Sequence, residues 1–148
     1  MNMADTIQKN IIHNSGDEPR VIEMKRGIPG FEGVKCYSLR RRDSESPFCI
    51  LESLGEAGPR FIAVNPFLAC PEYEPVIPDR EIRLLEIENP SQIFLMVLVT
   101  VRRDPLDVTV NLQAPLVINM DRNLAAQVVL EDQDWPFRHS IMPTQSAV

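Results

Sequence analysis

The residue types that most often supply catalytic and metal-binding groups are scarce in this sequence. It has two histidines, His13 and His139, one near each end, and no histidine pair at the spacing that zinc sites use. It contains no phosphate-binding loop, no dinucleotide-binding fingerprint and no nucleophile elbow. We therefore expect no catalytic residue, no metal site and no bound cofactor.

Cysteine is also sparse. Cys36, Cys49 and Cys70 are odd in number and include no C-x-x-C pair. Such a set is not typical of a disulfide framework or a zinc cluster. We expect three reduced, buried thiols in a cytoplasmic protein.

Long hydrophobic stretches are missing as well. The longest apolar run, residues 93–101, is interrupted by Thr100 and is far shorter than the roughly 20 residues that span a bilayer. The first ten residues, MNMADTIQKN, lack the apolar core of a signal peptide. We therefore expect a cytoplasmic location and no membrane contact.

Basic residues are outnumbered by acidic ones, 15 against 21, which gives a net charge of −6. A surface of this sign repels phosphate backbones, so we expect no direct binding to nucleic acid. It favours a basic protein partner and speeds their encounter. A modest net charge also serves solubility alone, and the composition leaves both interpretations open.

Proline, in contrast, is frequent, and 13 of the 148 residues divide the chain into short segments. The segments with a strand pattern are residues 20–24, 34–41, 48–54, 60–65, 93–102, 107–111, 116–119 and 124–130. Both faces of residues 93–102 are apolar, which indicates a central, buried strand. Residues 66–78 are typical of a structured loop, and residues 78–87 favour a short helix, with a strand as the alternative. The sequence predicts one mostly β domain over residues 1–148, an antiparallel β-barrel or rolled sheet with one short helix, ordered over about residues 20–135 with flexible ends.

Two acidic stretches and one glycine-rich loop are candidate contact regions. Residues 72–88 hold six acids against two arginines, and residues 131–134 hold three acids directly before Trp135. An aromatic side chain beside acids suits a basic, partly apolar partner, but Trp135 would equally pack beneath the sheet and anchor the tail. In the loop, Ile28 and Phe31 form either an exposed docking knob or a plug in the core.

Five segments of the sequence, taken together, resemble a known family. They are residues 27–32 (GIPGFE), 65–67 with 73–75 (NPF and YEP), 96–101 (MVLVTV), 109–119 (TVNLQAPLVIN) and 126–130 (AQVVL). In this order and spacing, from about residue 20 to residue 131, they are similar to the FliW family of flagellar assembly factors.

The resemblance implies a protein-binding regulator and flagellin chaperone. FliW proteins bind the translational regulator CsrA away from its RNA groove, and so relieve its repression of flagellin messenger RNA by an allosteric route. Free flagellin binds FliW and displaces it from CsrA, which couples flagellin synthesis to export. We therefore expect a CsrA-type regulator and flagellin as partners. The residues expected to contact partners are Ile28, Pro29, Phe31, Tyr73, Glu74, Asp79 and Glu81.

Three alternatives stay open. The segment 111–115 either contributes contacts or is structural, with Asn111 and Gln113 satisfying backbone groups at a bend. A rival function is a small β-barrel enzyme or ligand carrier with an internal, carboxylate-lined pocket near His139. A third is a structural subunit that assembles only with itself.

Overall fold

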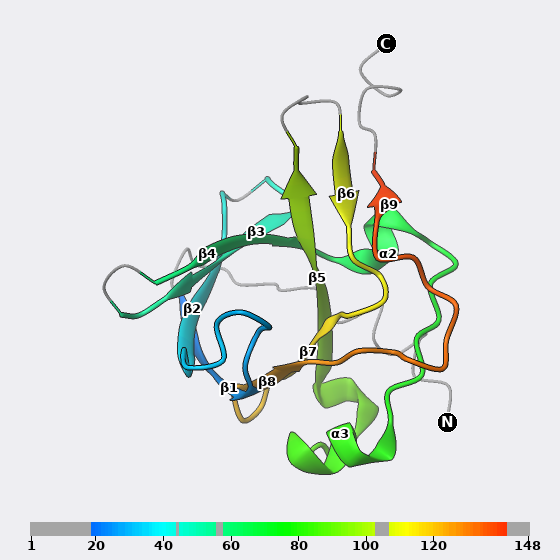
Figure 1. The fold of residues 1–148 in the computed structure, drawn as a ribbon. Coiled ribbons are helices and arrows are strands. Elements are labelled where there is room, and N and C mark those ends of the chain that lie inside the picture. The colour runs from blue at the N-terminus through cyan, green and yellow to red at the C-terminus, as the bar shows by residue number, and fades with distance from the viewer. Residues whose placement is uncertain (1–18, 44, 56–57, 103–106, 142–148) are drawn as a thin grey trace.

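The computed structural model describes residues 19–43, 45–55, 58–102 and 107–141. Short strands dominate these residues, and the helical segments are brief (Figure 1). In chain order the elements are β1 (Arg20–Arg26), β2 (Cys36–Arg41), β3 (Phe48–Ser53), β4 (Arg60–Val64), α2 (Pro66–Ala69), α3 (Asp79–Leu84), η1 (Pro90–Gln92), β5 (Ile93–Val101), β6 (Val108–Val110), β7 (Leu116–Asn119), β8 (Leu124–Gln127) and β9 (His139–Ser140).

Seven strands close into a barrel in the order β4-β3-β2-β1-β8-β7-β5, and pairing between β4 and β5 completes the ring. Neighbouring strands are antiparallel except β1 and β8, which run parallel. Closure leaves these strands without free edges. The prediction of a mostly β, largely antiparallel barrel is confirmed.

The long strand β5 explains how β6 and β9 join this barrel. Its first half, Ile93 to Met96, pairs with β7, and its last three residues pair with β6 along the same edge. Strand β9 then pairs with β6. This short extension projects past the barrel beside the end of β5 (Figure 1).

Two apolar cores lie on opposite faces of the β5–β7–β8 wall. The barrel interior includes Ile22, Met24, Tyr37, Leu39, Leu51, Phe94, Met96 and Ile118. An outer core, which includes Phe67, Tyr73, Ile77, Leu85, Leu95, Val117, Val128 and Leu130, lies between the barrel wall and the segments that carry α2, α3 and the C-terminal residues. Both faces of β5 are thus buried over residues 93–97, as the sequence predicts, while Thr100 and Val101 are exposed.

The helices agree with the sequence in one case and differ in the other. The predicted helix after Pro78 is confirmed as α3. The stretch expected to be a loop begins instead with α2, because Asn65 caps it and Pro66 occupies its first turn. The Asn65 side-chain oxygen accepts a hydrogen bond from the Phe67 amide at 2.8 Å. A four-residue helix is too short to leave an apolar period in the sequence.

The described residues continue beyond residue 135, the C-terminal limit expected for the core. Residues 136–141 are described, and they add β9 to the eight strands that the sequence indicates. The expected flexible ends fall largely on residues 1–18 and 142–148, outside the described residues. No helix within the described residues is long and apolar enough to cross a membrane.

Candidate partner-binding surface

Two acid-rich segments that are distant in the sequence form one surface. The side-chain amide of Gln133 accepts a hydrogen bond from the Val76 amide at 2.8 Å and donates one to the Val76 carbonyl at 2.8 Å. Figure 1 shows the segment after α2 running beside the segment that leads to β9. We call the exposed acids of these two segments the acidic seam: Glu72, Glu74, Glu131, Asp132 and Asp134.

Aromatic packing beneath the acidic seam holds the C-terminal segment in place. The Trp135 ring lies edge-on to the Tyr73 ring, with centroids 4.8 Å apart. The Tyr73 hydroxyl donates a 2.6 Å hydrogen bond to the Leu112 carbonyl, and burial raises the pKa of Tyr73, so this phenol stays protonated. Trp135 is partly buried against the outer core, which supports its interpretation as an anchor.

Apolar side chains are exposed close to the acids of the seam. Val76, held by Gln133, is 63% exposed, and Phe137, two residues beyond Trp135, is 59% exposed. The Arg138 guanidinium lies 5.4 Å from the centre of the Phe137 ring. Acids interspersed with apolar side chains suit a partner surface that is basic and partly apolar.

Two acids at α3 and in the turn after it are different, because arginines pair with them. Glu81, only 1% exposed, forms ion pairs with Arg26 and Arg80, and Glu86 pairs with Arg122 at 3.0 Å. The sequence suggested one acidic region over residues 72–88. The structure divides it into the acidic seam, the paired acids Glu81 and Glu86, and the exposed acids Asp79 and Glu88.

The predicted contact residues separate by exposure. Pro29, Phe31, Glu74 and Asp79 are exposed, and Glu74 belongs to the acidic seam. Ile28, Tyr73 and Glu81 are 4%, 0% and 1% exposed. These three side chains are buried: Ile28 fills the barrel interior, Tyr73 fills the outer core and Glu81 is covered at α3. Their role as contact residues stays a prediction.

The glycine-rich loop combines the two forms expected for it. Ile28 plugs the barrel, and its carbonyl accepts a 2.7 Å hydrogen bond from the Phe31 amide. Phe31 is 42% exposed and rests edge-on against Phe61, with centroids 5.7 Å apart. Glycine is required at position 27, where a Cβ would lie 2.6 Å from the Glu32 Cα, and at Gly30, where φ is +90°.

Two residues of this surface were missed because their contact depends on long-range pairing. Gln133 and Val76 carry no local signal that they meet. In the segment 111–115, the Asn111 side chain accepts hydrogen bonds from the Gln113 and Ala114 amides at 3.0 and 3.1 Å. This favours the structural alternative for Asn111.

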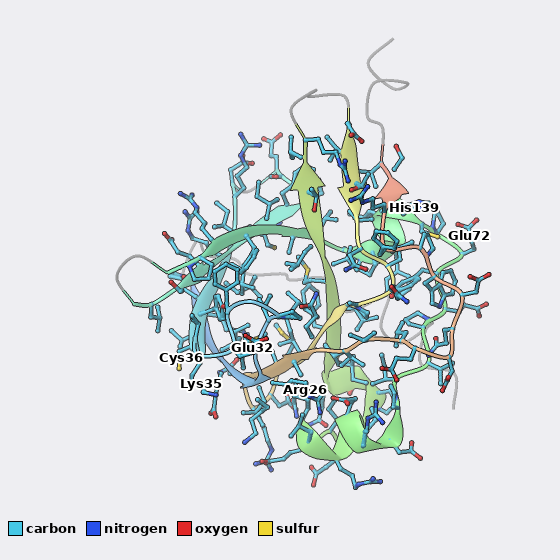
Figure 2. The ribbon with its side chains drawn as sticks, in the orientation of Figure 1. Arg26, Glu32, Lys35, Cys36, Glu72 and His139 are labelled. Carbon is cyan, nitrogen blue, oxygen red and sulfur yellow. The ribbon has the colours of Figure 1, made fainter. Side chains whose placement is uncertain are left out.

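The surroundings of His139 do not resemble a nucleophilic site. Figure 2 shows His139 and Glu72 on the same side of the molecule. The Cys70 thiol donates to Glu72 at 2.9 Å, and burial together with this bond raises the pKa of Cys70 to about 11, so the thiolate is scarce near neutral pH. Among the described residues, no three side chains of the kinds that bind metals are grouped to hold an ion.

Comparisons with known proteins converge on one family. A sequence profile described as FliW protein matches residues 6–141. The chain is 43% identical over 125 residues to the flagellar assembly factor FliW of Syntrophus aciditrophicus, covering 84% of this chain and 79% of that protein. It is 34% identical to the protein of the same name from Clostridium botulinum, covering 96% and 99% of the two chains. A crystal structure of the flagellar assembly factor FliW superposes with a TM-score of 0.76 at 34% identity, covering 90% of both chains.

Proposed function

This chain belongs to the FliW family of flagellar assembly factors, and we propose that it works as a protein-binding regulator in the cytoplasm and not as an enzyme. The proposal treats residues 1–148 as one functional domain. Its support lies in what fills the barrel: apolar side chains pack the interior core. Among the described residues the buried acid is Glu81, which Arg26 and Arg80 hold at α3, whereas the rival enzyme or carrier requires a carboxylate-lined chamber. Function then depends on the outer surface.

The first partner in this proposal is a CsrA-type translational regulator, bound through the acidic seam. The observation that carries the assignment is the pairing of Gln133 with Val76, because it gathers five exposed acids around an exposed apolar side chain. An RNA-binding regulator must carry basic surface to attract phosphates. Such a surface is complementary to the acidic seam.

The consequence for the regulator is antagonism of its repression of flagellin messenger RNA. A seam of carboxylates brought against the regulator repels RNA phosphates without occupying the RNA groove, which is consistent with an allosteric route. Flagellin is the second proposed partner, whose binding releases the regulator and couples flagellin translation to export.

Co-elution tests this proposal. The purified chain is mixed at micromolar concentrations with the CsrA-type regulator of the same organism and passed over a sizing column, with and without flagellin. We expect a complex with the regulator that flagellin dissociates. The proposed function would be contradicted if the chain elutes separately from the regulator and from flagellin, in low and in physiological salt.

A further inference from the structure

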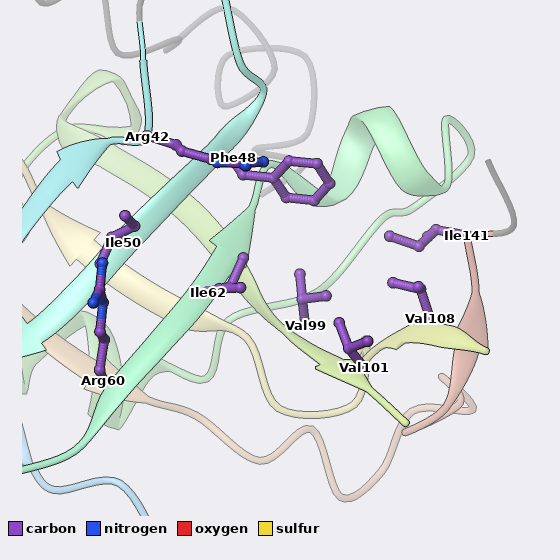
Figure 3. Close-up of a pocket in the computed structure, with 9 residues that line it drawn as sticks. All are labelled: Arg42, Phe48, Ile50, Arg60, Ile62, Val99, Val101, Val108 and Ile141. Carbon is purple, nitrogen blue, oxygen red and sulfur yellow. The ribbon is translucent and has the colours of Figure 1, made fainter. Parts of the chain in front are cut away.

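A groove of about 550 Å³ lies on the outer face of the barrel, where β3, β4, β5 and β6 meet. Seven of its nine lining side chains are apolar and the other two are arginines (Figure 3). They are Phe48, Ile50, Ile62, Val99, Val101, Val108, Ile141, Arg42 and Arg60. No residue of this groove belongs to the acidic seam.

Strand register explains the apolar floor and the opening of the groove. Ile50, Ile62 and Val99 are direct neighbours across β3, β4 and β5. Pairing between β4 and β5 ends at Val99, so the last two residues of β5 pair only with β6. Ile62 and Val101 are consequently 42% and 54% exposed. The apolar surface of the outer core, to which Phe48, Val99 and Ile141 pack, thus continues into the groove.

The charge of the groove is opposite to that of the molecule. The chain has a net charge of −6, yet the charged side chains that line the groove are Arg42 and Arg60. Within the described part of the chain neither arginine forms an ion pair. Arg60 on β4 lies opposite Glu52 on β3, but the two side chains are not paired. A guanidinium covered by a docked partner needs a carboxylate to offset its lost hydration.

The spacing of the two arginines indicates what kind of ligand provides those carboxylates. The Arg42 amide donates to the Phe48 carbonyl at 2.9 Å, and Arg60 lies opposite Glu52. Phe48 and Glu52 are four residues apart on β3, so the levels at which the two arginines leave the sheet are separated by roughly 13 Å. A segment that carries more than one carboxylate can reach both levels. A second copy of this chain docked symmetrically would place one basic groove against another.

We propose that this groove binds an amphipathic segment of a partner protein, with an apolar face on the groove floor and acidic side chains that reach Arg42 and Arg60. The inference does not depend on the proposed function. The acidic seam and the groove then select segments of opposite charge on two separate surfaces, so one chain can hold two partners of different chemistry.

Two fluorescent helical peptides of about 18 residues test the proposal. Both carry leucines along one face, flanked by glutamates in one peptide and by lysines in the other. We expect the wild-type chain to bind the glutamate peptide at least about tenfold more tightly than the lysine peptide, measured by fluorescence anisotropy. The double variant Arg42→Glu/Arg60→Glu should reverse that preference, while the matched control Lys25→Glu/Lys35→Glu should preserve it.

The floor of the groove is tested separately. Ile62→Asp should lower the affinity for the glutamate peptide by about tenfold or more. Val21→Asp, at a similarly exposed valine outside the groove, should leave that affinity unchanged. Circular dichroism checks the fold of each variant. The proposal is overturned if the two peptides bind equally, or if the arginine reversal leaves the preference unchanged. It is also overturned if dodecanoate at equal concentration displaces the glutamate peptide, or if the chain self-associates in a way that Ile62→Asp abolishes. Co-elution of the Arg42→Glu/Arg60→Glu variant with the CsrA-type regulator provides a separate readout, because it reports on the acidic seam and not on the groove.

Discussion

The side-chain amide of Gln133 pairs with both backbone polar groups of Val76, 57 residues earlier in the sequence. This is the hydrogen-bond pattern of one rung of a β-ladder, formed here by a side chain. It connects two segments that share no strand pairing in the described structure. The two halves of the acidic seam are therefore aligned by this side chain together with the packing of Trp135 on Tyr73.

Gln133→Ala removes both of these hydrogen bonds while keeping all five acids of the seam. We expect a loss of about 1–2 kcal/mol in the free energy of unfolding, measured by urea denaturation, since each neutral hydrogen bond contributes about 1 kcal/mol or less at an exposed site. Affinity for the CsrA-type regulator should fall by about tenfold because the two acidic segments lose this alignment, although Trp135 still packs on Tyr73. Gln113→Ala, at a glutamine whose side chain has no hydrogen bond among the described residues, is the control. Unchanged affinity in Gln133→Ala would show that the alignment is unimportant.

Asn119 should be among the polar residues most important for stability. Its side chain, fully buried, donates to the Leu85 and Glu86 carbonyls at 2.8 and 3.2 Å and accepts from the Asp121 and Arg122 amides at 3.0 and 3.3 Å. Asn119→Ala leaves these backbone groups without their hydrogen-bond partner, and we expect the free energy of unfolding to fall by about 2–4 kcal/mol. Thermal or urea unfolding measures this directly, and a loss under about 0.5 kcal/mol would contradict the account.

Glu81 should matter for folding and not for partner binding. Its buried carboxylate holds Arg26, at the end of β1, and Arg80 on α3. Glu81→Gln weakens both contacts, and we expect a loss of about 1–3 kcal/mol, moderated because the two arginines are half exposed and remain solvated. Asp79→Asn, an exposed carboxyl on the same helix, should change stability by less than about 0.5 kcal/mol. A larger effect at Asp79 than at Glu81 would reverse this interpretation.

The three cysteines should differ in reactivity. Burial raises the pKa of Cys49 to about 11, against an opposing effect of Arg41, and the pKa of Cys70 to about 11 as well. Native protein at pH 8 should therefore react with a thiol reagent at one site, the exposed Cys36, and denatured protein at three. Mass spectrometry counts the labelled thiols. Rapid labelling of all three in the native protein would contradict the predicted protection of Cys49 and Cys70.

The same shifts set a pH dependence of stability. The folded-state pKa of these two thiols lies above the unfolded value near 9, so folding favours their neutral form. The contribution of these two thiols to the free energy of unfolding is complete below pH 9 and is lost as the pH rises toward 11. Cys49→Ala/Cys70→Ala should flatten the decline in urea midpoint over that interval, compared with the wild-type chain.

The strands were largely predictable from the sequence because their signal is local. The alternation of apolar residues located β1 to β8, and the two apolar faces of residues 93–97 identified the central strand between the cores. Short elements were not predictable: α2 depends on one cap at Asn65, and β9 on pairing with a strand about 30 residues earlier. Neither has the length over which periodicity is visible.

The candidate surface was predictable in composition but not in geometry. The sequence identified both acidic stretches, and only the folded structure shows that Gln133 joins them and that arginines neutralise Glu81 and Glu86. Ile28 and Tyr73 lie in segments that resemble the family, yet both side chains are buried. Membership in a motif therefore does not distinguish a contact residue from a core residue.

Charge reversal in the acidic seam tests the central claim most directly. The measurement is the dissociation constant of the CsrA-type regulator, by isothermal titration calorimetry, for Glu74→Lys/Asp132→Lys and for the control Glu23→Lys/Glu88→Lys, which makes the same change in net charge at exposed acids outside the seam. If the seam is the binding surface, the first variant should lose at least about tenfold in affinity and the control about twofold or less. Equal losses in the two variants, or none in either, would contradict it.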